Sequence, residues 1–266
     1  MAHILLPTDF SGNALNAAKY AAMLFGTEGN TFTVLNSFMA PHAGASVLMS
    51  LDDILGRESR EGVEEFAKRL QEDMDLSKST VEVISEHGDL PGVIARLQED
   101  DPSIDAVVMG TQGATGLKEV LMGSNTADVV RRSTKAVLAV PEKAEHQLPK
   151  RILVADDGGR VDRATVQVLL DIARKGNAEI HLVRVKTDEE RTGSHYPELL
   201  DGISFRTFEI EGEDVESALN DQVKVSDADL VVMLRRKLGL FEGIFHRSAS
   251  KRMVMHTHIP LLVLQQ

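Results

Sequence analysis

Residues suited to anion binding follow an apolar run in the first half of the chain. Ile104–Val108 is rich in β-branched residues without polar alternation, which is typical of a buried parallel strand. Gly110, Gly113 and the pair Gly123-Ser124 follow it, with two residues between the first two glycines and nine before the third. Glycines let backbone amides approach an oxyanion, and a helix start adds free amides and a positive dipole end. The spacing indicates a phosphate site, and a strand-to-helix connection with a Ser N-cap is the alternative.

Commoner nucleotide and catalytic motifs are absent from the sequence. Lys118 lacks the G-x-x-x-x-G-K-[ST] frame, and no G-x-G-x-x-G follows the first expected strand. No G-x-S-x-G elbow occurs, and no spacing singles out a catalytic pair of carboxylates. His256-Thr257-His258 shows no third zinc ligand. We therefore predict no catalytic residue and no protein metal site.

A second polar segment, Pro7-Thr8-Asp9-Phe10-Ser11, directly follows another apolar run. Asp9 has two interpretations: a turn or N-cap residue before Ser11, or a carboxylate that accepts protons from ligand hydroxyl or amine groups. Both polar segments lie after strands, and parallel sheets bind ligands at the carboxyl ends of their strands. Their convergence would support a nucleotide site.

The elements that position these segments form an internal repeat. Ile4–Asp9 matches Ile152–Asp157 at an offset of 148 residues, and Asp105–Met109 matches Asp229–Met233 at an offset of 124. The second copy is shorter by 24 residues between its second and third strands. There the first copy has apolar residues at helical spacing: Val63, Phe66, Ala67, Leu70 and Met74. The second copy has only Thr187–Asp201, with room for a turn or two of helix.

Each copy alternates strands with helices, which predicts a parallel α/β sheet. In the first copy we expect strands near 3–7, 32–38, 79–85, 104–109 and 136–140, and helices near 12–26, 52–74, 90–99 and 124–133. Right-handed crossovers then give a doubly wound sheet. We expect two domains, residues 1–145 and 150–266, connected through the polar segment Glu142–Pro149.

The pattern Gly110-x2-Gly113-x9-Gly123-Ser124 after a buried strand resembles the ATP-binding signature of universal stress proteins. The resemblance is strong in residues 1–141 and weak in 150–266, and it indicates a tandem, two-domain member of this family. It implies two Rossmann-like domains of the adenine nucleotide alpha hydrolase-like kind. Each would be a five-stranded parallel sheet of order 3-2-1-4-5 flanked by helices, with the crevice between its first and fourth strands.

The resemblance also implies a ligand, ATP with or without magnesium, and the residues that hold it. Pro7 would be a wall of the adenine slot, Asp9 would lie near ribose and adenine, and the main chain at Ser37 would be the adenine edge. Asn36-Ser37 departs from the His-Val usual there. The complete predicted set is Pro7, Asp9, Ser37, Met109, Gly110, Gly113, Gly123, Ser124 and Asn125.

The second copy lacks most of the glycine pattern. At the offset of 124, Gly110, Gly113 and Gly123 are replaced by Leu234, Lys237 and Arg247, and only Ser248 keeps its type. Because side chains fill the space for phosphate, we expect ATP in the first domain only. A basic cluster there is a candidate anion pocket, and pairing with local acids is the commoner role: Arg235, Arg236, Lys237 and Arg247.

The function implied is an ATP-dependent stress-response sensor or switch. The alternatives are a weak ATPase or self-phosphorylating enzyme using the same pocket, and a nucleotide-free structural module. We expect Ala136–Val140 and Pro260–Leu264 to pair edge to edge, so that the family's dimer is internal. A further homodimer and a signalling partner are open at this point.

Composition limits the other partners. The net charge of −12 argues against nucleic acid or an anionic membrane as the main partner. With no cysteine, disulfides and thiolate chemistry are excluded. No charged leader precedes the first strand, and no apolar run reaches membrane-spanning length. We expect a soluble cytoplasmic protein.

Overall fold

The computed structural model describes residues 1–40, 45–111, 123–186, 194–211, 215–236 and 259–266. In its N-terminal half, strands and helices alternate along the chain. They are β1 (His3–Pro7), α1 (Gly12–Phe25), β2 (Glu28–Phe38), α2 (Ala45–Asp73), β3 (Lys78–His87), α3 (Leu90–Asp100), β4 (Ile104–Gly110), α4 (Ser124–Arg132) and β5 (Ala136–Val140). The predicted alternation is confirmed, although α2 begins earlier than expected.

The C-terminal half repeats this order as far as its fourth strand, with a much shorter second helix, and most of the residues between its fourth and fifth strands lie outside the described ranges. Its elements are β6 (Arg151–Ala155), α5 (Arg163–Gly176), β7 (Glu179–Lys186), α6 (Tyr196–Leu199), β8 (Phe205–Glu211), α7 (Val215–Ser226), β9 (Leu230–Arg235) and β10 (Leu261–Gln265). α2 has 29 residues, whereas α6, which follows the equivalent strand, has 4. This difference lies where the sequence predicts the shortening.

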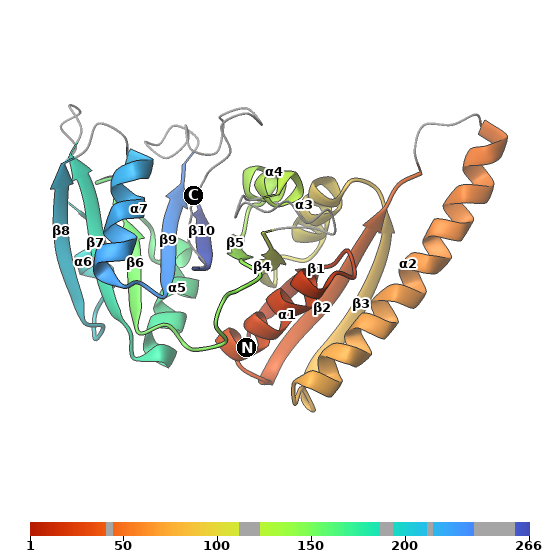
Figure 1. The fold of residues 1–266 in the computed structure, drawn as a ribbon, viewed down its shortest axis with the longest axis horizontal. Coiled ribbons are helices and arrows are strands. Elements are labelled where there is room, and N and C mark those ends of the chain that lie inside the picture. Colours follow the sequence, from red (N-terminus) through yellow and green to blue (C-terminus); the bar gives the residue numbers. More distant parts are fainter. Residues whose placement is uncertain (41–44, 112–122, 187–193, 212–214, 237–258) are drawn as a thin grey trace.

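The ten strands of the described residues form one sheet, in the order β3-β2-β1-β4-β5-β10-β9-β6-β7-β8 (Figure 1). Each half taken alone therefore has the order 3-2-1-4-5. Within each half neighbouring strands are parallel, and the halves meet where β5 and β10 pair antiparallel, with Leu138 opposite Leu262. Both leucines are completely buried, so the joint between the halves is part of the core.

Helices cover both faces of the sheet and bury two apolar layers. One layer contains residues of α1, α2 and α5, and the other contains residues of α3, α4 and α7. Each layer runs across both halves of the sheet. This arrangement explains why β1, β4, β5, β6, β9 and β10 are buried almost throughout, since both of their faces are covered.

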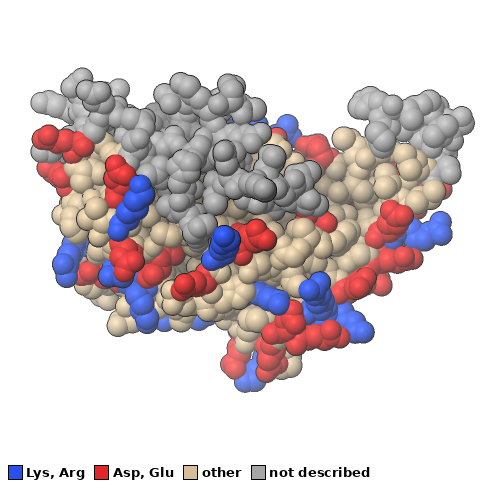
Figure 2. All heavy atoms as spheres, viewed as in Figure 1, with Lys and Arg blue, Asp and Glu red and all other residues tan. Residues whose placement is uncertain are grey.

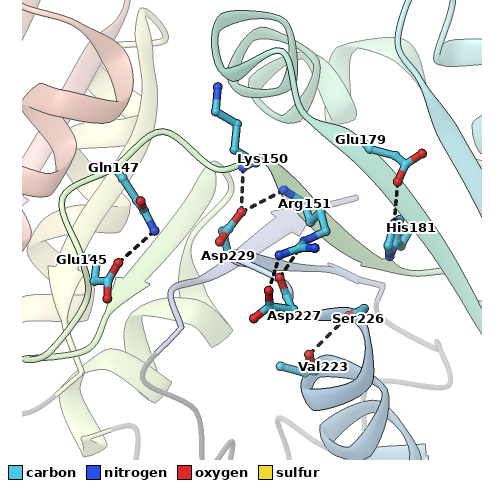
Figure 3. Close-up of polar contacts among 10 residues, drawn as sticks. All are labelled: Glu145, Gln147, Lys150, Arg151, Glu179, His181, Val223, Ser226, Asp227 and Asp229. Atoms are coloured by element: carbon cyan, nitrogen blue, oxygen red, sulfur yellow. Dashed lines mark hydrogen bonds and ion pairs between the residues drawn. The ribbon is translucent and has the colours of Figure 1, made fainter.

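The repeat extends to individual hydrogen bonds. In the N-terminal half the backbone amide of His3 donates to Asp105 Oδ2 at 2.9 Å. In the C-terminal half the amide of Arg151 donates to Asp229 Oδ2, also at 2.9 Å (Figure 3). These residues correspond at the offsets of 148 and 124. An aspartate at the equivalent position, Asp105 or Asp229, thus connects the starts of the first and fourth strands in each half.

The described surface carries both signs of charge. On the face in Figure 2, basic and acidic side chains are interspersed, and α2 shows both along its length. Among the described residues, no helix combines the length and apolarity that crossing a membrane requires.

Candidate functional site

The N-terminal ends of α1 and α4 meet at Gly110, the last residue of β4. A Cβ added at Gly110 would lie 2.6 Å from Asn13 Nδ2 in the first turn of α1. On the other side, the Thr126 hydroxyl in the first turn of α4 donates to the Gly110 carbonyl at 2.9 Å. Only glycine leaves room for this approach. Gly110 therefore fixes the spacing of two helix starts, each of which is the positive end of a helix dipole.

The start of α4 presents amides at the carboxyl edge of the sheet. Ala127 N–H makes the first helical bond, to the Gly123 carbonyl at 3.0 Å, so the amides of Ser124, Asn125 and Thr126 precede it. Ser124 and Asn125 are exposed. Among the described residues, no side chain caps this helix start. These amides could therefore bind an anion.

Gly123 has a different role from the one expected. Its amide, predicted to meet phosphate, donates to the Thr111 carbonyl at 2.6 Å. A Cβ on Gly123 would lie 3.0 Å from the same carbonyl oxygen, which explains the glycine. The bond joins the end of β4 to the start of α4. Gly123 thus positions the amides that follow it.

The end of β1 forms a tight turn into α1. Pro7 is buried, whereas Asp9 is exposed, and Asp9 Oδ1 accepts the Ser11 amide at 3.1 Å. Ser11 caps α1 by accepting the amide of Ala14. Phe10 adopts a φ of 65°, which is a strained backbone conformation for a bulky residue. Strained conformations of this kind occur most often at functional sites. The turn role of Asp9 is present in the structure; contact with a ribose stays a prediction.

The end of β2 is fixed by a chain of side-chain hydrogen bonds. Asn36 Nδ2 donates to the Thr8 carbonyl at 2.7 Å, and Asn36 Oδ1 accepts the Ser59 hydroxyl at 2.8 Å. Ser59 lies on α2 and is buried, and its hydroxyl also bonds Ser85 at 2.7 Å. This network holds the main chain beside the half-buried Ser37. The departure from histidine at position 36 therefore has a structural use.

The predicted residues gather at one edge of the sheet, because β1 lies between β2 and β4. Pro7, Ser37 and Gly110 lie at or next to the carboxyl ends of these strands, and Met109 is buried in β4 beside Gly110. Gly113 lies outside the described residues, as does the histidine pair His256 and His258. In the described ranges, no group of three or more acidic or histidine side chains is placed to hold a metal ion.

The corresponding edge of the C-terminal half carries two buried ion pairs. Asp157, which aligns with Asp9, accepts Arg236 Nε on Oδ2 at 2.9 Å. Asp156, which aligns with Thr8, accepts Arg184 Nη2 at 2.9 Å. Each carboxylate side chain is 1 % exposed. A buried carboxylate needs a partner of opposite charge, so the C-terminal half requires these two arginines for its own stability.

Arg236 also covers the loop after β6. Its guanidinium lies 3.0 Å from a Cβ built on Gly159, the residue aligned with Ser11, and bonds Gln266 Oε1 at 3.1 Å. Tyr196 is buried nearby, and burial, followed by the charges of Asp156 and Asp157, raises its pKa above the usual range. Arg236 therefore pairs internally, the commoner alternative above. Lys237, Arg247 and Ser248 lie outside the described residues.

Sequence reasoning missed several residues of the site. Asn13 and Thr126 are buried polar residues whose relation to Gly110 depends on how two helices pack, which no local spacing indicates. Arg184 does have a signal, because at the offset of 148 it aligns with Asn36. Both residues connect the end of the second strand to the end of the first. Comparing the two copies position by position would have found this pair.

A family model matches most of the chain. The model described as Universal stress protein family matches residues 1–141 and 198–265. The chain belongs to the universal stress protein family. Among its relatives is Universal stress protein MJ0577 of Methanocaldococcus jannaschii, 28% identical over 158 residues that cover 53% of this chain and 94% of the relative.

Solved structures support the fold over the full length. A universal stress protein from Archaeoglobus fulgidus superposes with a TM-score of 0.75 at 20% identity, covering 99% of this chain and 98% of that one. The cytoplasmic domain of a prokaryotic cation chloride cotransporter gives a TM-score of 0.56 at 9% identity, covering 99% and 95%. At these identities the likeness shows the fold alone, and function must be argued from the site.

Proposed function

We propose that this universal stress protein binds one ATP, in its N-terminal half only, and acts as a nucleotide-dependent switch in stress responses. The observation that carries the proposal is the convergence of α1 and α4 at Gly110. Two helix starts and the exposed carboxylate of Asp9 face the same edge of the sheet. Helix starts favour phosphate, and a carboxylate accepts protons from hydroxyl or amine groups.

The residues present fit a nucleotide. The absence of a side chain at Gly110 lets Asn13 of α1 and Thr126 of α4 lie close together at the end of β4. In the proposal, the amides of Ser124 and Asn125 hold phosphate oxygens, with Gly113 and a magnesium ion as further contacts. Pro7, Met109 and the main chain at Ser37 then border the adenine, and Asp9 meets the ribose.

The C-terminal half supports the asymmetry. The carboxylate aligned with Asp9 is there bonded to Arg236, and Leu234 stands in place of Gly110. A nucleotide in this half would have to break a buried ion pair, which leaves an uncompensated charge and is strongly unfavourable. We propose two domains, 1–145 and 150–266, that act as an internal pseudo-dimer in a soluble cytoplasmic chain.

A charge substitution at the start of α4 tests the phosphate site. Ser124→Asp places a carboxylate among the helix amides, where it should stabilise the helix by about 0.3–1 kcal/mol and repel phosphate. We expect a melting temperature equal to or above that of the wild type and an ATP affinity at least about tenfold lower in calorimetric titration, since about 1.4 kcal/mol is tenfold.

The matched control is Ala164→Asp, which adds the same charge to the first turn of α5. Ala164 is exposed, and that turn contains no acidic residue in the wild type. We expect similar stabilisation and unchanged ATP affinity. Equal affinity in the Ser124 variant and the wild type would refute the phosphate site at α4.

A further inference from the structure

The helix α1 begins at the candidate crevice and ends against the other half of the chain. Lys175 Nζ, in the last turn of α5, donates to the carbonyls of Met23 at 3.1 Å and Leu24 at 2.9 Å. These are among the last carbonyls of α1, which have no partner within their own helix. The C-terminal half therefore caps the far end of α1.

The ammonium of Lys175 lies between two helix ends. α1 ends at Phe25 and α5 ends at Gly176, so the negative ends of both dipoles face this cation, which stabilises them. Its contact with α1 is close, because a Cβ at Gly26 would lie 3.0 Å from Nζ. Burial lowers the pKa of Lys175. The cation is thus partly withdrawn from water at the interface between the halves.

The helix α4 is held in the same manner. Gln265, on β10, donates from Nε2 to the Val130 carbonyl at 3.1 Å, in the last turn of α4. Gln265 Oε1 in turn accepts Arg235 Nη1 at 3.3 Å, and both residues belong to the C-terminal half. The C-terminal end of α4 therefore also accepts a hydrogen bond from a side chain of the C-terminal half.

We propose that the C-terminal half is a positioning partner for the nucleotide site, and that Lys175 and Gln265 are its positioning residues. The two helices they hold are the ones whose starts meet at Gly110. This inference rests on the proposed ATP site and assigns a task to the half without a nucleotide. It also implies that one chain needs only one functional glycine loop.

The effect is mechanical rather than electrostatic. α1 has 14 residues, so its ends are about 21 Å apart, whereas charges in water are screened within about 8 Å at physiological salt. A helix packed in a dense core moves as a unit, so releasing one end shifts the other. A site of this kind tolerates displacements of only about 0.5 Å.

The chain contains a matched control for Lys175. Lys150 Nζ donates to the Gly176 carbonyl at 2.8 Å, so it caps the end of α5 with the same chemistry. Lys150 lies directly before β6, where its backbone amide also bonds Asp229 (Figure 3). Its contact stays within the C-terminal half. Removing the Lys150 side chain should affect stability without affecting the nucleotide site.

The test is calorimetric ATP titration of the full chain and its variants. Lys175→Met and Gln265→Met keep side-chain length and remove the donors, and we expect the double variant to bind ATP at least about fivefold more weakly. Lys175→Arg should restore most of the affinity. Lys150→Met should lower the melting temperature and leave the affinity unchanged. Without nucleotide, hydrogen exchange at 124–132 should be faster in the double variant than in Lys150→Met.

The outcomes separate this inference from the proposed function. If the wild type binds no ATP, the proposed site and the inference both fail. If the wild type binds ATP and the double variant binds it equally well, only the inference fails. The inference is also overturned if Lys150→Met weakens ATP binding as much as the double variant does for the same decrease in melting temperature. Should the double variant not fold, Gln265→Met alone, at a half-buried residue, decides between the same outcomes.

Discussion

At the scale of single residues, the candidate site depends on the absence of a side chain at Gly110. Gly110 is positioned between Asn13 of α1 and Thr126 of α4, and a Cβ there would come within 3.3 Å of the Asn13 carbonyl as well as its amide group. The glycine spacing in the sequence singles out this position, and its predicted contact with phosphate stays a prediction. The spacing could not indicate that the atoms nearest to Gly110 belong to Asn13 of the same chain and not to a ligand.

Gly110→Ala should therefore weaken both folding and binding. We expect a loss of about 1–3 kcal/mol in the free energy of unfolding, the usual effect of overpacking, measured by urea denaturation. ATP affinity should fall as the helix starts move apart.

Gly12→Ala is the control for this substitution, because Gly12 begins α1 and an added Cβ meets no atom within 4 Å. We expect Gly12→Ala to be neutral or stabilising by up to about 1 kcal/mol. Equal stability of the two variants would contradict the packing described around Gly110.

At the scale of elements, α2 shows what periodicity can and cannot predict. Its apolar spacing identifies the turns from Val63 onward. Continued towards the N-terminus, the same face carries Ser59, Gly56 and Asp52, which are not apolar, so the pattern predicts a later start than the observed Ala45.

These residues serve tertiary contacts instead. Ser59 bonds Asn36, and a Cβ at Gly56 would lie 3.0 Å from the ring of Phe38. A Cβ at Gly62 would lie 2.5 Å from the ring of Phe10. Because these partners come from the end of β2 and from the turn between β1 and α1, helix periodicity alone could not reveal them.

The ion pair between Asp157, which follows β6, and Arg236, which follows β9, gives a prediction at this scale. Arg236→Met would leave the Asp157 carboxylate buried without its guanidinium partner. We expect a loss of about 3–5 kcal/mol in the free energy of unfolding, measured by urea denaturation.

Arg206→Met is the comparison for Arg236→Met. Arg206 Nε also lies 2.9 Å from a carboxylate, that of Glu179, but the two side chains are 68% and 27% exposed. An exposed pair contributes about 0–1 kcal/mol. If both substitutions have the same small effect, Asp157 is not held as described, and the proposal that only the N-terminal half binds ATP loses its support.

At the scale of the whole molecule, the two halves form one folded body. The pairing of β5 with β10, expected because the resemblance implies that the family's dimer is internal in a chain with two copies, is confirmed. The antiparallel register, with Val137 opposite Val263, depends on how two complete sheets meet and has no local signal. The contacts of Lys175 and Gln265 across this joint are equally invisible to any pattern within one copy.

The asymmetry of ligand binding is the central claim, and a crystal structure of the full chain grown with excess ATP and magnesium tests it most directly. The account predicts one nucleotide per chain, with its phosphates at the amides of Ser124 and Asn125 and its ribose beside Asp9. The Asp157–Arg236 pair should remain intact in the same crystal. A nucleotide bound beside Asp157, or two empty crevices at saturating ATP, would contradict the account.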